Sequence, residues 1–203
     1  GFNNTHCVRG EAFLQAQGVL IAQTPALPRS QRDNFHPTRS LPGGHILSGG
    51  LGGLGLLAAR LLLERGARQL LLLSRSGRVA VGSGSDAMLL ARNGGDVVRR
   101  MRCDVSDDDA VRRMMRIAQG EGTHIRGIFH AAHRVCDGAL VNQNSLNFVH
   151  AFGPKVHGAQ SLHAAAQCAP LEYFNTFSSM AALLGSAGQA PHSAANSWLC
   201  AMA

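Results

Sequence analysis

A run of glycines shortly after residue 44 is the part of this sequence whose residue types and spacing most directly imply chemistry. Glycine has no side chain, so backbone N–H groups can come close to phosphate oxygens, and the N-terminus of a following helix adds partial positive charge. The apolar residues before the run and the helix-like stretch after it predict a strand, a tight turn and a helix that hold a dinucleotide pyrophosphate. Two overlapping patterns fit, GxGxxG at Gly50, Gly52 and Gly55, and GxxxGxG at Gly49, Gly53 and Gly55.

A cation follows the next apolar strand, in the segment Ser74-Arg75-Ser76. Dinucleotide-binding folds that take NAD usually carry an acidic residue here, which bonds the ribose 2′-hydroxyl. A guanidinium instead favours the 2′-phosphate of NADP, because it can form two parallel hydrogen bonds to phosphate oxygens. The alternative for Arg75 is an ordinary surface charge at the end of a strand.

The residues around these motifs alternate between strand-like and helix-like patterns. Strands followed in turn by helices are typical of a parallel, doubly wound sheet, so the sequence predicts an α/β fold of the Rossmann type. We expect strands at 45–47, 69–74, 97–103, 127–130 and 172–178. We expect helices at 54–65, 86–92, 145–166 and 192–203, with an interruption of the third near Gly153-Pro154. A further helix is expected after Ser106, which would be its N-cap, with Asp107, Asp108 and Asp109 in its first turn.

The first 43 residues differ from the rest of the chain. A strand-like stretch at 12–22 is followed by a proline-rich segment, which indicates the tail of an upstream structural subdomain and a linker. Residues 44–203 are expected to form the dinucleotide-binding domain. Because only about five strands are expected and the sequence stops within a helix, we interpret this domain as truncated at its C-terminus.

The composition excludes several classes of protein. With 203 residues, of which 45% are hydrophobic, the chain is not disordered, and its net charge of +7 suits an anionic partner. One Trp and one Tyr, without aromatic residues interleaved with basic ones, give little support to nucleic-acid binding. Five widely spaced cysteines without a metal-ligand pattern indicate reduced thiols in the cytoplasm and no metal site, and neither a signal peptide nor a membrane span is expected.

Ordered segments from His45 to Ala203 resemble the ketoreductase domain of modular type I polyketide synthases, within the short-chain dehydrogenase/reductase superfamily. The segments are Ser48–Gly55, LLLSRSG at 71–77, CDVS at 103–106, FHAA at 129–132, PKVHGA at 154–159, FSS at 177–179 and LGSAGQ at 184–189. The stretch from Val8 to Ala22 is similar to the end of the structural subdomain that precedes the catalytic one in such synthases.

The resemblance implies that NADPH is the cofactor and that the glycine turn and the ends of the following strands hold it. For Asp104, a role as a turn former is the alternative. The implied cofactor-binding residues are Ser48, Gly49, Gly50, Leu51, Gly52, Gly53, Leu54, Gly55, Ser74, Arg75, Asp104, Val105, His130, Ala131 and Ala132.

The resemblance also implies how the carbonyl is reduced. In this family a tyrosine donates a proton, a serine hydrogen-bonds the carbonyl, a lysine lowers the tyrosine pKa, and an asparagine lies four residues after the tyrosine. These positions fall on His192, Ser179, Lys155 and Asn196, respectively. The alternatives are a solvent-exposed helix lysine for Lys155 and a strand-end cap for Ser179.

Histidine therefore stands where the family has tyrosine, and His133 stands where the family has glycine. Three interpretations of His192 remain open: a catalytically inactive domain with a structural or docking role, an imidazolium that replaces the phenol as the acid, or a sequence error or drift. Because the imidazole is shorter than a phenol and the neighbouring lysine disfavours its charged form, we expect impaired activity.

The implied reaction is the reduction of a β-ketoacyl group on an acyl carrier protein to the β-hydroxyacyl group, with that carrier and neighbouring synthase domains as partners. Asp137 matches the last aspartate of the Leu-Asp-Asp motif of the reductases that give D-configured alcohols, and Leu184 stands where the opposite class has tryptophan. Asp137-Gly138 is equally a turn signal. The alternatives are an inactive docking domain and a stand-alone short-chain dehydrogenase, and Asn196 in the lysine position of Tyr-x-x-x-Lys speaks against the latter.

Overall fold

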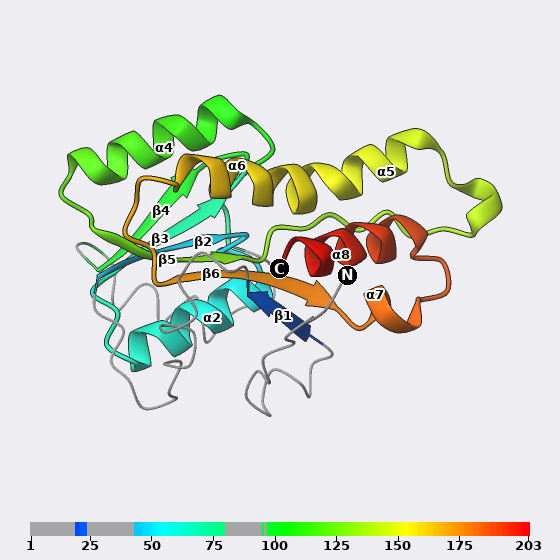
Figure 1. Cartoon of the computed structure of the whole chain (residues 1–203), viewed down its shortest axis with the longest axis horizontal. Helices are drawn as coiled ribbons and strands as arrows, with labels where there is room; N and C mark the ends of the chain where they lie inside the picture. Colours follow the sequence, from blue (N-terminus) through cyan, green and yellow to red (C-terminus); the bar gives the residue numbers. More distant parts are fainter. Residues whose placement is uncertain (1–18, 24–42, 80–94, 96) are drawn as a thin grey trace, which may run out of the picture.

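A computed structural model describes residues 19–23, 43–79, 95 and 97–203. Within these residues the fold is built on one six-stranded sheet with the strand order β1-β6-β5-β2-β3-β4 (Figure 1). Five strands run parallel, and the edge strand β1 pairs antiparallel with β6. The strands are β1 (Val19–Gln23), β2 (Gly44–Ser48), β3 (Gln69–Ser74), β4 (Val98–Arg102), β5 (Ile125–His130) and β6 (Tyr173–Ser179).

The parallel part of the sheet confirms the predicted doubly wound fold. The chain proceeds outward from β2 through β3 to β4 and then returns to place β5 on the other side of β2. This reversal makes the carboxyl ends of β2 and β5 the topological switch point, where ligands bind in folds of this kind. Within the predicted 12–22 strand, the described part is Val19–Ala22, which belongs to β1 and extends this same sheet. Residues 1–18 and 24–42 lie outside the described residues, so the predicted domain division stays a prediction.

Helices cover both faces of the sheet, with α2 (Gly53–Glu64) on one face and α4 (Asp108–Gly120), α5 (Ser145–Phe152) and α6 (Gly158–Ala165) on the other (Figure 1). Alternate strand residues point to opposite faces and fill two separate cores. Leu47, Leu70 and Leu72 join α2 in one core, whereas Ile46, Leu71 and Leu73 join α4 and α6 in the other. The last helices, α7 (Ala181–Leu184) and α8 (Ala190–Met202), follow β6, and α8 packs against α5, α7 and β6. The expected helix at 86–92 lies outside the described residues.

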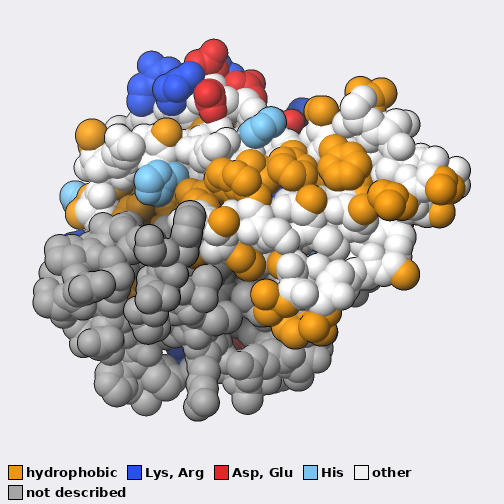
Figure 2. Space-filling model, turned by 45° about the vertical axis from the view of Figure 1, so that its right-hand side comes forward, with side chains coloured by type: hydrophobic (Ala, Val, Ile, Leu, Met, Phe, Trp, Pro, Cys, Tyr) orange, Lys and Arg blue, Asp and Glu red, His pale blue; other side chains and the backbone are white. Residues whose placement is uncertain are grey.

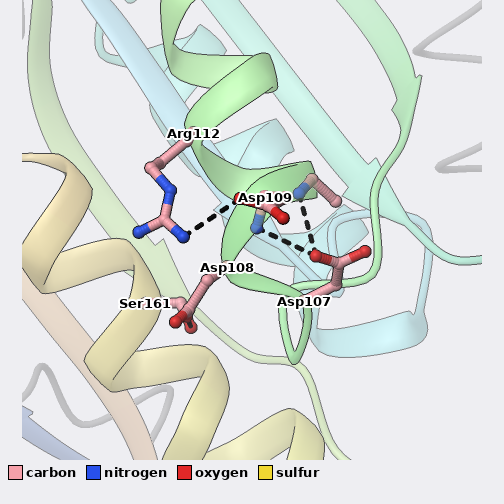
Figure 3. Close-up of polar contacts among 6 residues, drawn as sticks. Asp107, Asp108, Asp109, Arg112 and Ser161 are labelled. Carbon is pink, nitrogen blue, oxygen red and sulfur yellow. Dashed lines mark hydrogen bonds and ion pairs between the residues drawn. The ribbon is translucent and has the colours of Figure 1, made fainter.

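The N-cap of α4 is Asp107, and the prediction of Ser106 was wrong by one residue. The Asp107 carboxylate accepts hydrogen bonds from the backbone N–H groups of Asp109 (2.9 Å) and Ala110 (3.1 Å), as Figure 3 shows. Ser106 is instead part of the preceding turn, in which its N–H donates to the Asp104 carboxylate at 3.0 Å. Asp108 accepts a hydrogen bond from Ser161 of α6, so the first turn of α4 is also fixed to its neighbour.

The predicted interruption of the long 145–166 helix is confirmed. A π-helical turn, Gly153–His157, separates α5 from α6. Pro154 has no N–H to donate to the preceding turn, and its ring disfavours a regular helix at this point. Gly158 then brings α6 close to the end of β4, because a Cβ there would lie 2.7 Å from the Val105 side chain. The π turn thus lies directly beside the carboxyl edge of the sheet.

Exposed hydrophobic side chains gather on one side of the molecule (Figure 2). They come from α5, from α7 and from the 3₁₀ turn Leu140–Asn142, which precedes α5. The most exposed are Leu140, Val141, Leu146, Val149, Leu183 and Leu184. Among the described residues nothing buries them, so they belong to the surface and not to either core.

Candidate functional site

The glycine turn after β2 is shaped by close backbone approaches. Gly49 has a φ of +67°, and a Cβ there would lie 2.8 Å from the backbone of Ala131 and Ala132, just after β5. A Cβ on Gly55 would lie 2.2 Å from the carbonyl oxygen of Gly49, because α2 begins against the turn. These two glycines are therefore required by the contact of the turn with β5 and with its own helix.

Gly53 is different, because a Cβ there would meet no atom within 4 Å. It is the first residue of α2, whose N-cap Gly52 supplies no side-chain hydrogen bond and whose first turn holds no acidic residue. The N-terminus of α2 thus keeps its partial positive charge and presents backbone N–H groups to open space. The partial positive charge and the open space in front of Gly53 suit an anionic group such as a pyrophosphate.

A pocket of about 500 Å³ opens in front of this helix N-terminus. It extends from the glycine turn past the ends of β3 and β4 to the end of β5. Of the residues predicted to bind the cofactor, it is lined by Gly49, Gly52, Gly53, Leu54, Gly55, Ser74, Arg75, Asp104, Val105, Ala131 and Ala132. Leu73, Ser76, Cys103, His133 and Pro154 line it as well and were not among those predictions.

Four residues predicted to bind the cofactor do not line the pocket. A Cβ on Gly50 would lie 2.7 Å from the carbonyl oxygen of Leu47, and Leu51 is part of the core on the α2 side. Ser48 and His130 are buried and hydrogen-bond each other, Ser48 Oγ to His130 Nδ1, at 2.6 Å. The sequence motif could not distinguish these four residues from the residues that line the pocket, because glycine and serine serve packing as well as ligand binding.

Arg75 is exposed at the rim of the pocket, after the end of β3. The turn that carries it is fixed by the Ser74 hydroxyl, which accepts a hydrogen bond from the Gly77 N–H at 2.9 Å. Within the described part of the chain no carboxylate pairs with Arg75, so its guanidinium is available to an anion. Asp104 makes the turn contact described above and also lines the pocket, so both roles considered for it are compatible with its position.

Lys155 lies in the π turn and is only 5% exposed, so it is not a solvent-exposed helix lysine. Its ammonium donates a hydrogen bond to the carbonyl oxygen of Phe177 in β6, at 2.8 Å. Burial lowers the Lys155 pKa from 10.5 to about 8. Lys155 is also the single lysine of a chain with 18 arginines, a signal in the sequence that marks this position as special.

His192 and Asn196 lie one turn apart on α8. The Asn196 amide donates to the carbonyl oxygen of His192 at 2.8 Å. Asn196 Oδ1 and His192 Nδ1 are buried and have no hydrogen-bond partner among the described residues. The His192 pKa is lowered, first by burial and then by the positive charges of Lys155 and His133, and Asp137 opposes this effect. Lys155 in the π turn and His133 and Asp137 in the loop after β5 thus all act electrostatically on His192.

Ser179 ends β6, and its hydroxyl accepts a hydrogen bond from the Ala181 N–H at 3.2 Å. The predicted strand-end cap is thus present, yet a hydroxyl that accepts this bond still has its proton to donate. Asp137 accepts hydrogen bonds from the Gln189 amide at 3.1 and 3.2 Å. Together with the bond from Gly138 N–H to the Gly188 carbonyl (2.8 Å), this joins the loop after β5 to the start of α8.

In the described ranges, no three His, Cys, Asp or Glu side chains are grouped as a metal site would need. No helix there has both the length and the apolar content needed to cross a membrane.

Comparison with known proteins supports the resemblance. The family model for the KR domain matches residues 43–203. The chain is 39% identical over 194 residues to phthioceranic/hydroxyphthioceranic acid synthase of Mycobacterium tuberculosis, covering 92% of this chain and 9% of that protein. It is 40% identical over 190 residues to a mycocerosic acid synthase-like polyketide synthase of the same species, covering 90% of this chain and 9% of that protein.

Solved structures agree with these relatives. A ketoreductase domain from the bacillaene assembly line matches with a TM-score of 0.71 and 32% identity, covering 80% of this chain and 39% of that one. A-type ketoreductases from a modular polyketide synthase match with a TM-score of 0.71 and 30% identity, covering 86% of this chain and 35% of the other. The chain thus spans about a tenth of the curated synthases that it resembles, and over that span it belongs to the ketoreductase (KR) domain family of polyketide synthases.

Proposed function

We propose that this ketoreductase domain binds NADPH in the pocket in front of α2, and that His192 impairs its turnover. The Gly53 cradle at the N-terminus of α2 supports the pyrophosphate site. Arg75 at the rim, which pairs with no carboxylate of the described residues, supports a contact with the 2′-phosphate. When bound, NADPH supplies the hydride for reduction of a carbonyl group.

The residues of this chain would polarise the carbonyl and deliver a proton. Ser179 can donate its hydroxyl proton in a hydrogen bond to the carbonyl oxygen, while its oxygen still accepts from Ala181. Lys155 is held at the carboxyl edge of the sheet by Phe177. With a pKa of about 8, it is mostly protonated near neutral pH and contributes positive charge to this region.

The observation that carries the impaired turnover is the packing of α8, which carries His192, against the π turn that carries Lys155. A neighbouring cation stabilises a phenolate, and therefore makes a tyrosine a better acid. The same cation disfavours an imidazolium, and burial lowers the His192 pKa further, so His192 is neutral near pH 7. A neutral imidazole is a poor proton donor, so the environment that would assist a tyrosine weakens a histidine.

The proposed substrate is a β-ketoacyl group carried by an acyl carrier protein, which would be reduced to the β-hydroxyacyl group. This proposal rests on membership of the ketoreductase family and on the multidomain relatives, for which neighbouring synthase domains are the further expected partners. Asp137 is proposed to shape the substrate side of the site and to favour the D-configured alcohol. The described cysteines are all unpaired, which supports the proposed cytoplasmic location.

The test compares the parent chain with His192→Tyr and His192→Phe in NADPH oxidation with a β-ketoacyl thioester. We expect slow turnover by the parent, a gain of about 100-fold with tyrosine, and no gain with phenylalanine, which has the ring but no acidic group. If the parent turns over rapidly and His192→Ala abolishes this activity, then His192 is a competent acid and the proposal is wrong.

The second candidate is a domain that binds NADPH but has only a structural or docking role. The bulky His133 at the pocket favours it, because this side chain lies beside the end of β5 where the cofactor is expected. In that case His192→Tyr would also be inert although NADPH binds, and activity would appear only after His133→Gly is added.

A further inference from the structure

The imidazole of His130 connects three parts of the candidate site. His130 is the last residue of β5 and is 1% exposed. Its Nδ1 lies 2.6 Å from the hydroxyl oxygen of Ser48, and its Nε2 lies 2.8 Å from the backbone carbonyl oxygen of Lys155. A carbonyl oxygen only accepts hydrogen bonds, so Nε2 carries the proton, and Nδ1 in turn accepts from the Ser48 hydroxyl.

Lys155 is consequently held at both ends of the residue. Its backbone carbonyl accepts from His130 in β5, and its ammonium donates to the carbonyl of Phe177 in β6. The two strands are neighbours, and His130 is paired in register with Thr176, the residue before Phe177. Adjacent strand ends thus determine both the backbone and the side-chain position of this lysine.

The packing around the ring supports a specific fit. Gly158 follows the π turn, and a Cβ there would lie 3.0 Å from His130 Cε1, so the glycine makes room for the imidazole. On the other side, Ser48 is the residue immediately before the glycine turn and is fully buried. A chain of hydrogen bonds therefore runs from the start of the glycine turn to the π turn.

We propose that His130 is a positioning residue that fixes the π turn through the carbonyl of Lys155 and thereby directs the single lysine of the chain to the carbonyl of Phe177. His130 was predicted to bind the cofactor, but this role places it behind the site, acting through Lys155. Its relevance to catalysis rests on the proposed function, whereas the contact itself can be tested without turnover.

Two substitutions separate this role from simple core packing. In His130→Gln the amide nitrogen lies near the position of Nε2 and can still donate to Lys155. In His130→Asn the shorter amide lies near the position of Nδ1, so it can bond Ser48 but does not reach Lys155. Because the chain has one lysine, ¹³C-labelled lysine gives a single NMR signal whose titration reports Lys155 directly.

We expect the Lys155 pKa to stay near 8 in the parent and in His130→Gln. In His130→Asn it should rise by about one unit or more, because the loosened π turn admits water to the ammonium. Equal pKa values in the parent and a folded His130→Asn would overturn the proposal, and so would equal shifts in the two variants.

A measurement on the unmodified chain keeps the proposal testable if His130→Asn does not fold. The ¹⁵N shifts of the His130 ring should show a neutral imidazole with the proton on Nε2 near neutral pH. A proton on Nδ1 would contradict the bond to Lys155. NADPH binding by the parent can be measured by quenching of its single tryptophan, Trp198. If the parent did not bind NADPH, the proposed function would be overturned, but the Lys155 titration and the His130 ring shifts would still test the positioning role.

Discussion

At the scale of single residues, Lys155 carries a charge that the fold buries at a cost. Its pKa falls from 10.5 to about 8, so the folded state favours the neutral amine more than the unfolded state does. Stability therefore increases as the pH rises from about 8 to 10.5, where the lysine loses its proton first in the fold and then in the unfolded chain.

Lys155→Met should accordingly stabilise the protein near neutral pH by about 1–3 kcal/mol, since it removes a desolvated charge and keeps the apolar stem. The loss of the bond to the Phe177 carbonyl offsets part of this gain. Urea unfolding at pH 7 and at pH 10 measures the effect, and the difference between the two proteins should shrink at the higher pH. A variant less stable than the parent at pH 7 would show that the ammonium stabilises the fold.

Arg75 is expected to set the choice between the two nicotinamide dinucleotides. Arg75→Asp should weaken NADPH binding about 10- to 100-fold, because a charge-assisted hydrogen bond to the 2′-phosphate is lost and a repulsion is added. NADH binding should stay the same or improve. Arg78→Asp, three residues further along the same exposed loop, is the matched control. Equal losses in the two variants would mean that Arg75 acts only through the net charge.

How far the sequence predicts single residues depends on what their roles require. Lys155 and Asn196 could be singled out from the resemblance, and the structure buries both. The position of Ser48 and His130 behind the pocket could not be foreseen, because it depends on the register between β2 and β5. The lowered pKa of His192 likewise depends on burial and on three groups from two other segments of the chain, the π turn and the loop after β5.

At the scale of elements, the glycine turn combines glycines that close packing requires, Gly49 and Gly55, with one glycine, Gly53, that no contact among the described residues requires. Gly53→Ala should leave the melting temperature unchanged or slightly raised, since its Cβ meets nothing and alanine favours the helix. It should nevertheless weaken NADPH binding, because the methyl group enters the space of the pyrophosphate.

Gly55→Ala is the contrasting variant, in which the Cβ would collide with the carbonyl of Gly49. It should lower the melting temperature as well as NADPH binding. Thermal unfolding together with a binding titration for both variants provides the comparison. If Gly53→Ala bound NADPH as tightly as the parent, the pyrophosphate would have to lie elsewhere.

Helix boundaries illustrate what local patterns can and cannot determine. Pro154 predicted the break in the 145–166 helix because the missing N–H and the ring act locally. The N-cap of α4 was misplaced at Ser106 because Ser106 and Asp107 are both residue types that cap helices well. Ser106 belongs to the preceding turn, where its N–H bonds Asp104, and Asp107 therefore becomes the cap. Such choices depend on contacts outside the window of sequence that a capping pattern covers.

At the scale of the whole molecule, the alternation of strands and helices was sufficient to predict the doubly wound sheet. The pairing of β1 with β6 was not predicted, because antiparallel addition to an edge leaves no periodic signal in the strand itself. The topological switch point between β2 and β5 then brings together residues separated by more than eighty positions, such as Gly49 and Ala131. Residues from distant segments thus form one pocket because of the sheet order.

The fold should lose stability in mild acid through His130. Its pKa is lowered from 6.5 to about 4 by burial, so the unfolded chain binds a proton more readily than the fold. The associated stability, about 3 kcal/mol, is present above pH 6.5 and is lost as the pH falls to about 4. Unfolding free energies of the parent and of His130→Gln between pH 7 and pH 4 measure this, and parallel curves would contradict it.

The central claim is that His192 stands in the proposed proton-donor position as a neutral imidazole, which is a poor acid near neutral pH. The most direct measurement is the pH dependence of NADPH oxidation by the parent and by His192→Tyr. Because the imidazolium fraction falls about tenfold per pH unit above its pKa, the parent rate should increase as the pH is lowered from 8 to 6, whereas the tyrosine variant should not show this increase. A parent rate that is high and constant across neutral pH would contradict the claim.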